Sequence, residues 1–358
     1  MGMYLESEAS TENPNIFYTN QLEVISYIQI CTSLLSIFGA GSVILVVLGK
    51  RKVRSQDVYP LFNLCLADLL ASLFIFSSAV TYTKHTTGGT VSESCAITTG
   101  FAAGFYMSSF SLSALYAYEV YLRVKSRLQS KRYSISSLST TWYHRFNLKY
   151  LCYVLSWVVP VAGSVALMIT VQDEGSGDSI DDPCANYECL LMFHQQNDLC
   201  LNSSRLGDEG RIVAKVLFIV PLILAMVAIL VIYILTFKLF RKVQKSGGVF
   251  STKQHEAVTD VRNKGLMYSA VFTFCWIPAL VLGVISLSDH VEVQNIYWLV
   301  IVQCLTATLQ GFLNCVIYGW NRRNFRAVKS RKDSYISVKY STRNNNSYGS
   351  LQDASDPT

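Results

Sequence analysis

The chain has 358 residues, of which 51% are hydrophobic and only 15% are charged. A typical soluble domain carries about 25% charged residues, so the composition excludes an ordinary soluble protein and favours one that crosses a membrane several times. The net charge of +6 does not indicate a nucleic-acid partner, because it arises from basic segments that alternate with apolar runs.

Seven apolar runs follow one another along the chain, and each is long enough to span a bilayer as a helix of about 20 residues. Helix is expected because a segment in lipid must satisfy its own backbone groups. The predicted spans are residues 22–48, 57–80, 95–122, 148–171, 212–238, 264–287 and 295–319. The predicted fold class is therefore an all-α membrane protein, a seven-transmembrane helix bundle over residues 22–320.

Lysine and arginine concentrate in alternate segments between these spans, and this bias sets the orientation of the chain. Of the 30 basic residues, 26 fall in segments 49–57, 123–149, 238–264 and 321–358. Residues 1–21 contain no lysine or arginine. We therefore expect residues 1–21 to be extracellular, followed by seven crossings and a cytoplasmic C-terminus.

The ten cysteines divide into two groups. Six lie inside predicted spans, away from their outer ends, where they are expected to pack as small apolar residues. The other four are Cys95, Cys184, Cys189 and Cys200, which face the outer side, where disulfides persist. Of the three pairings that four cysteines allow, we prefer Cys95 with Cys200 and Cys184 with Cys189; free thiols are the alternative. Asn202 opens a glycosylation sequon in the same outer loop.

Several motifs within the spans resemble those of the G-protein-coupled receptor superfamily. In the second span, "NLCLAD" places Asn63 and Asp68 as in the rhodopsin-like motif Asn/Ser-Leu-x-x-Ala-Asp. A lone carboxylate in mid-membrane is expensive, and it is by default a candidate functional residue. We expect a polar cluster that holds water or a sodium ion, with Asn314 and Ser109 or Ser111 as partners. A neutral, hydrogen-bonded aspartic acid is the alternative.

The sixth span carries the most specific motif of the chain. Its sequence "FTFCWIP" matches the family pattern Phe-x-x-Cys-Trp-x-Pro at Phe272, Cys275, Trp276 and Pro278. Pro278 weakens the backbone ladder of the helix. The resemblance implies that Trp276 lies beneath a ligand cavity and that repacking of its ring swings the cytoplasmic half of the helix. A kink with ordinary core packing is the alternative.

The seventh span mixes two branches of the superfamily. Asn314 and Tyr318 match the ends of the rhodopsin-like Asn-Pro-x-x-Tyr, but Cys315 replaces the proline. The stretch "QGFLN", residues 310–314, is more similar to the cyclic-AMP-receptor-like and secretin-like branches. With its rhodopsin-like sixth span, the mosaic most closely resembles the transmembrane protein 116 family.

The third span ends in "YEVYLRV", residues 118–124, where the family has an Asp/Glu-Arg-Tyr triplet. Glu119 and Tyr121 match this triplet, but Val120 replaces the arginine, which in the family helps to lock the inactive state and then contacts the G protein. Arg123 could reach the same region, because residues i and i+3 share a helix face. The alternative is that Arg123 is an ordinary snorkelling residue at the membrane surface.

The resemblance covers about residues 22–330 and implies a receptor that transmits an extracellular signal to a heterotrimeric G protein or another cytoplasmic transducer. The ligand stays open, but Ala102 stands where amine receptors have an aspartate, so a biogenic amine would lack its counter-ion. Phe325 resembles the start of a short amphipathic helix along the inner membrane face. We expect the rest of segment 321–358 to be disordered.

Two other functions compete with the receptor hypothesis. A seven-span protein that does not couple to G proteins would act as a decoy, a trafficking factor or a scaffold, and Val120 and Cys315 favour it. An intramembrane enzyme or transporter is disfavoured, because all five histidines fall in loops or at span ends. We expect no enzymatic activity, no cofactor beyond the sodium ion, and location in the plasma membrane, with an internal membrane as the alternative.

Overall fold

The computed structural model describes residues 19–49, 58–85, 94–129, 139–173, 190, 208–245, 252–285 and 293–319. Every regular element within these ranges is a helix. The chain divides into two compact units, Met1–Asn314 and Cys315–Thr358. The first unit contains the helix bundle and all contacts discussed below.

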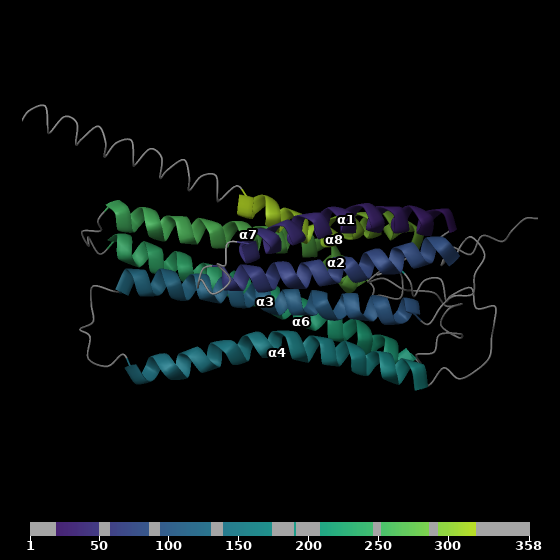
Figure 1. Ribbon diagram of the computed structural model, residues 1–358, viewed down its shortest axis with the longest axis horizontal. Helices are drawn as coiled ribbons and strands as arrows, with labels where there is room; N and C mark the ends of the chain where they lie inside the picture. The colour runs from purple at the N-terminus through teal and green to yellow at the C-terminus, as the bar shows by residue number, and fades with distance from the viewer. Residues whose placement is uncertain are drawn as a thin grey trace, which may run out of the picture. The chain divides into compact units, whose positions relative to one another are not determined.

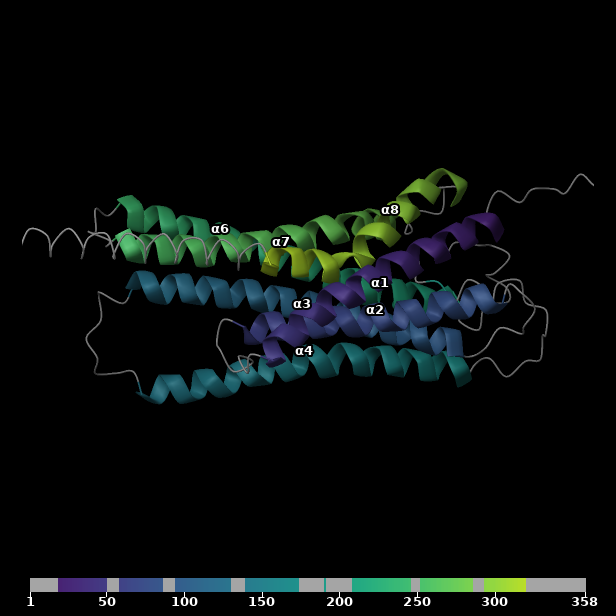
Figure 2. The same cartoon turned by 45° about the horizontal axis from the view of Figure 1, so that its top comes forward.

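The first six predicted spans each form a helix that extends beyond the apolar run at one end or at both, and the seventh is divided among shorter helices. The helices of the bundle are α1 (Thr19–Gly49), α2 (Tyr59–His85), α3 (Ser94–Gln129), α4 (Ser139–Asp173), α6 (Asp208–Lys245), α7 (Thr252–Ile285), the short 3-10 helix η3 (Val293–Ile296) and α8 (Tyr297–Thr308). A last helix, Gln310–Gly319, follows α8 after a 45° bend. Figures 1 and 2 show the long helices running side by side.

Five of these helices are long and apolar enough to cross a membrane, and α8 with the last helix makes a sixth, bent span. Helix α3 has 36 residues but falls short in hydropathy, because serine, threonine, glycine and tyrosine interrupt its apolar run. Its position explains the difference. Helix α3 contacts α2, α4, α6 and α7 (Figures 1 and 2), so protein rather than lipid covers most of its surface.

Helices α4 and α6 turn large apolar side chains outward. Leu151, Val154 and Val158 on α4 are exposed, and so are Leu224 and Leu230 on α6. Extended exposed apolar surface marks a face that another apolar phase covers. These faces are where the bundle meets lipid.

Two of the buried apolar clusters, among the described residues, concern the candidate site and the outer loop. The larger one surrounds Trp276 and combines residues of α2, α3, α6, α7 and α8. The second joins Leu22 of α1 and Tyr82 of α2 to the end of α7 and the start of α8. Leu190, which lies between α4 and α6 in the sequence, is fully buried in this second cluster. A residue of the predicted second outer loop is thus part of the core.

The last helix approaches α1 and α2 very closely at two glycines. A Cβ atom added to Gly39 would lie 2.6 Å from the Cα atom of Phe312. A Cβ added to Gly311 would collide with Ser36 Oγ and lie 3.3 Å from the Cβ of Asp68. Small residues allow helix backbones to pack at such distances in membranes. This approach brings the start of the last helix next to Asp68.

Candidate functional site

A buried polar cluster surrounds Asp68 of α2. Asp68 is only 1% exposed, and it accepts hydrogen bonds from two side chains that the sequence nominated as partners. Ser109 Oγ donates to Asp68 Oδ1 at 2.8 Å, and Asn314 Nδ2 donates to Oδ2 at 2.8 Å. Ser111, the other candidate, donates instead to the carbonyl oxygen of Met107 at 3.3 Å. The structure therefore brings together residues of α2, α3 and the last helix, and it satisfies a carboxyl group that would be costly to bury unpaired.

Gln310 connects this cluster to the tryptophan of α7. Its Nε2 donates to Asp68 Oδ1 at 3.0 Å and to Ser109 Oγ at 2.9 Å. Its Oε1 accepts a hydrogen bond from Trp276 Nε1. An indole N–H can only donate, so Gln310 must turn its oxygen toward Trp276 and its NH2 group toward Asp68. The orientation of the amide therefore follows from its partners.

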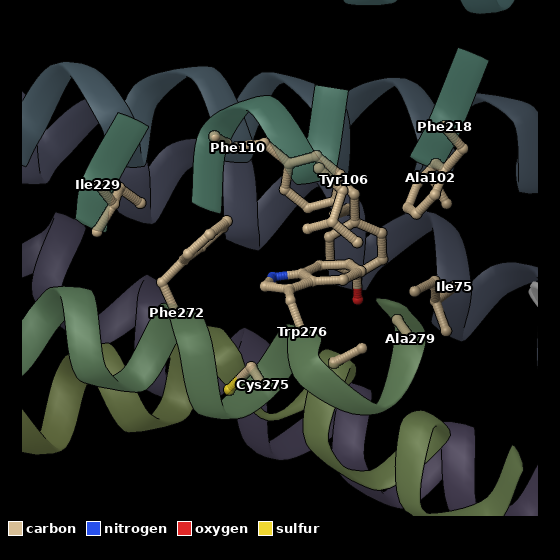
Figure 3. Close-up of a cluster of buried hydrophobic side chains, with 14 of the residues drawn as sticks. Ile75, Ala102, Tyr106, Phe110, Phe218, Ile229, Phe272, Cys275, Trp276 and Ala279 are labelled. Atoms are coloured by element: carbon tan, nitrogen blue, oxygen red, sulfur yellow. The ribbon is translucent and has the colours of Figure 1, made fainter. Parts of the chain in front are cut away.

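Aromatic rings of α3 and α6 pack around Trp276. Trp276 is fully buried, and its ring centroid lies 4.5 Å from that of Phe110 and 4.9 Å from that of Tyr106 (Figure 3). Both pairs are edge-to-face, an arrangement that contributes about 0.5–1.5 kcal/mol per pair beyond area burial. Phe218 of α6 lies at 6.1 Å. Movement of the indole therefore has to repack residues of both α3 and α6.

The other residues predicted for a ligand pocket or switch lie close to Trp276. Phe272 and Ala102 are buried in the same cluster, where Ala102 is on α3 (Figure 3). Pro278 lies inside α7, two residues after Trp276, and it has no N–H to offer to the helix ladder. Thr306 Oγ1 of α8 donates to the carbonyl oxygen of Cys275 at 3.1 Å, in the same turn. The role of these residues in ligand binding remains a prediction.

Glu119 is the centre of a second polar group, at the end of α3 predicted to be cytoplasmic. Tyr153 of α4 donates its hydroxyl to Glu119 Oε1 at 2.9 Å, and Lys149 Nζ lies 2.6 Å from the same oxygen. Arg123 Nη2 lies 2.9 Å from Glu119 Oε2, one turn along the same helix. Glu119 thus ties α3 to α4 and pairs with Arg123. Because Lys149 and Arg123 are partly exposed, each ion pair contributes at most about 1 kcal/mol.

Val120 occupies the position on α3 where the family resemblance predicts an arginine, and its side chain faces α7. Its side chain is buried and packs on Gly265 of α7. A Cβ atom added to Gly265 would lie 2.7 Å from Val120 Cγ1 and 3.1 Å from Cγ2. Valine and glycine therefore form a tight apolar contact between α3 and α7. Tyr121, the next residue, is half-buried, and Lys125 Nζ lies 5.9 Å from its ring centroid.

The remaining predicted site residues lie outside what the structure describes or outside the bundle unit. Cys184, Cys189, Cys200 and Asn202 fall outside the described residues, and Cys95 lies in α3 without a described side chain. Their disulfides and glycosylation stay predictions.

Tyr318 belongs to the second compact unit, Cys315–Thr358. Its predicted place in the polar cluster therefore also stays a prediction.

Gln310 and Gly265 are the main contact residues that the sequence did not nominate as candidates. Gln310 carried a usable signal, because it is a polar residue in an apolar span. It also lies four positions before Asn314 and so shares a helix face with it. Gly265 carried no such signal, since its importance depends on Val120 of another helix.

Comparisons with known proteins agree with this architecture. Melatonin receptor type 1B-B of Danio rerio is 24% identical over 315 residues, which cover 85% of this chain and 80% of that receptor. Melatonin receptor type 1A of Phodopus sungorus is 26% identical over 319 residues, with 86% and 79% covered. The probable G-protein coupled receptor 34 of Mus musculus is 22% identical over 288 residues, with 78% and 68% covered.

These homologues and the apolar helices define a multi-pass membrane protein of the G-protein-coupled-receptor type, with a seven-transmembrane helix bundle. The family model for transmembrane protein 116 matches residues 22–340. The chain belongs to the transmembrane protein 116 family.

Proposed function

We propose that this protein is a receptor that converts binding of an extracellular ligand into activation of a heterotrimeric G protein. The observation that carries the proposal is the contact pattern of α7. Trp276 in mid-helix is bound to Gln310 and the Asp68 cluster, and Gly265 on the same helix packs on Val120. Eleven residues of helix correspond to about 17 Å along the axis. One helix, α7, thus joins Trp276, the candidate switch residue, to the end of the bundle where Val120 and Gly265 meet. We call that end the coupling end.

In this mechanism the Val120–Gly265 contact keeps the coupling end of the bundle closed. The family arginine would hold the inactive state by its charge, whereas Val120 holds α7 against α3 by close apolar packing. Rearrangement of the Trp276 ring would carry the Gln310 amide with it and repack the rings of Tyr106 and Phe110. Pro278 lacks the N–H of the helix ladder and so weakens α7 next to Trp276, which would let the part of α7 that carries Gly265 follow that movement.

The chemistry of the core supports an uncharged ligand. The cluster around Trp276 consists of apolar and aromatic side chains, and Ala102 supplies no counter-ion for a cation. Two of the relatives are named as melatonin receptors, so melatonin is a suitable first probe. An agonist effect in the wild type that Trp276→Ala removes would support a ligand site above this ring.

Orientation and location complete the proposal. From the distribution of basic segments we propose that the N-terminus is outside and that the ends of α3 and α7 that carry Glu119, Val120 and Gly265 are in the cytoplasm. This side is where a G protein would bind. We propose the plasma membrane as the site of action, with the outer loop held by the Cys95–Cys200 and Cys184–Cys189 disulfides.

A protein that does not couple to G proteins is the second candidate, and one observation favours it. Val120 stands where the family has the arginine that contacts the G protein, and Arg123 is paired with Glu119. In that case the same helix movement would control the binding of another cytoplasmic partner.

The test is basal G-protein activation in cells, read by energy-transfer sensors for each G-protein class at matched surface expression. We expect the wild type to signal and Trp276→Ala to change the level. Trp157→Ala is the matched control, because Trp157 also donates its N–H to a buried amide, Asn63 Oδ1 at 3.2 Å, but lies on α4. If the wild type and Val120→Arg are silent for every class, the receptor proposal fails and the second candidate gains.

A further inference from the structure

The sequence suggested water or a sodium ion beside Asp68, and the geometry of the cluster tests this. Hard cations are bound by several oxygen ligands. An ionised carboxylate has about four lone-pair sites. In the structure, Oδ1 of Asp68 accepts from Ser109 and Gln310, and Oδ2 accepts from Asn314. Three hydrogen-bond donors therefore already occupy most of the lone-pair sites of the carboxylate that a cation would need.

The position of one nitrogen decides the question. Gln310 Nε2 lies 3.0 Å from Asp68 Oδ1 and 2.9 Å from Ser109 Oγ, between the two oxygens that would form the cation site. An amide NH2 group carries partial positive charge on its hydrogens, so it satisfies these oxygens and repels a cation from the same place. Trp276, which can only donate, prevents the amide from turning its oxygen toward Asp68. The residues present do not fit a sodium ion.

We infer that Gln310 takes the place of a bound cation and links Trp276 directly to Asp68. The switch tryptophan and the buried carboxyl group are thereby joined through a side chain of the protein. Gly311 makes this possible, because the absence of a side chain there lets the last helix approach α2. The protein's stability is then insensitive to the identity of the monovalent cation. The inference deepens the proposed switch, but it concerns contacts that exist whether or not the chain signals.

The test measures the melting temperature of the purified full-length protein in sodium, potassium and choline chloride at equal ionic strength. We expect the wild type to melt at the same temperature in all three salts. Gln310→Ala removes the amide and opens space beside Asp68. We therefore expect its melting temperature to be lower than that of the wild type in all three salts, but higher in sodium chloride than in potassium or choline chloride. Asp68→Asn in the same chain should abolish that rise in sodium chloride. Gln310→Ser serves the same purpose if Gln310→Ala does not fold.

Gln303→Ala is the matched control. Gln303 is another fully buried glutamine, on α8, that has no hydrogen bond to Asp68, and its replacement should give no sodium response. A sodium-specific rise in the wild type that Asp68→Asn removes would overturn the inference. The absence of a sodium response in the Gln310 variant that folds would also overturn it, because Gln310 would not be what excludes the ion. A silent G-protein panel affects neither readout.

Discussion

Gln310 forms hydrogen bonds with Trp276, Asp68 and Ser109, and each of them depends on which way its amide faces. A buried polar group that loses its partner costs about 1–3 kcal/mol. If the Trp276 indole moved alone, Gln310 Oε1 would be left buried without a donor. The ring and the amide are therefore expected to move together, and with them the Asp68 cluster.

The first prediction concerns the indole N–H. Trp276→Phe keeps an aromatic ring but removes the donor to Gln310, so we expect a loss of about 1–3 kcal/mol in stability and a changed basal signal. Thermal unfolding of the purified protein measures the first, and the G-protein sensors measure the second.

Trp157→Phe provides the comparison for this prediction, since it removes an equivalent N–H donor to Asn63. It should lower stability without changing the basal signal per receptor at the cell surface. Equal effects of both variants on signalling would show that the Trp276–Gln310 bond has no special place in the switch.

The helices of this bundle are held at their closest points by glycines. Gly39 on α1 meets the backbone of Phe312, and Gly265 on α7 meets Val120 on α3. Such contacts leave no room for a side chain, so they fix the separation of two helices more strictly than contacts between flexible side chains. The first of them positions the helix that carries Gln310, and the second closes the predicted coupling end.

The second prediction compares two glycines of α1. Gly39→Ala places a Cβ 2.6 Å from a backbone atom of Phe312, which cannot yield, so we expect destabilisation of roughly 1–3 kcal/mol. Gly41→Ala, two residues on, meets nothing within 4 Å, and we expect a gain of up to about 1 kcal/mol from helix propensity. Thermal unfolding of both variants checks the opposite signs. Equal changes would contradict the close approach of α1 and the last helix.

At the scale of the whole molecule, the fold class was predictable and is confirmed, because a bilayer dictates both the length and the helical form of a span. Helix α3 is the instructive exception. It lies in the middle of the bundle and needs less hydropathy, so its motifs identify it better than its composition does.

The contacts of the candidate site were predictable only where a family motif or a costly buried polar residue marked them. Asp68, Ser109 and Asn314 were nominated as partners, and the structure places them in contact. The role of Gln310 depends on the bend before it, and that of Gly265 on a valine in another helix. Neither contact can be predicted from the sequence of a single helix, because each depends on how two segments pack.

The third prediction concerns orientation in the membrane. An epitope tag at the N-terminus should be stained on intact cells, and a tag at the C-terminus only after permeabilisation, because the basic segments remain on the cytoplasmic side. The reverse pattern would contradict the proposed topology. As an independent check, Asn202→Gln should abolish the mass loss that glycosidase treatment causes in the wild type.

The most direct test of the central claim measures basal G-protein activation in two variants. The first enlarges Gly265, and the second also makes Val120 smaller. Gly265→Ala puts a Cβ 2.7 Å from Val120 Cγ1 and should push α7 away from α3, so we expect a basal signal above that of the wild type. Adding Val120→Ala removes both γ-methyl groups and should bring the signal back toward the wild-type level. Gly41→Ala, whose new methyl meets no neighbour, should leave it unchanged. A signal that stays at the wild-type level in Gly265→Ala, or that rises but is not reversed by Val120→Ala, would contradict the account.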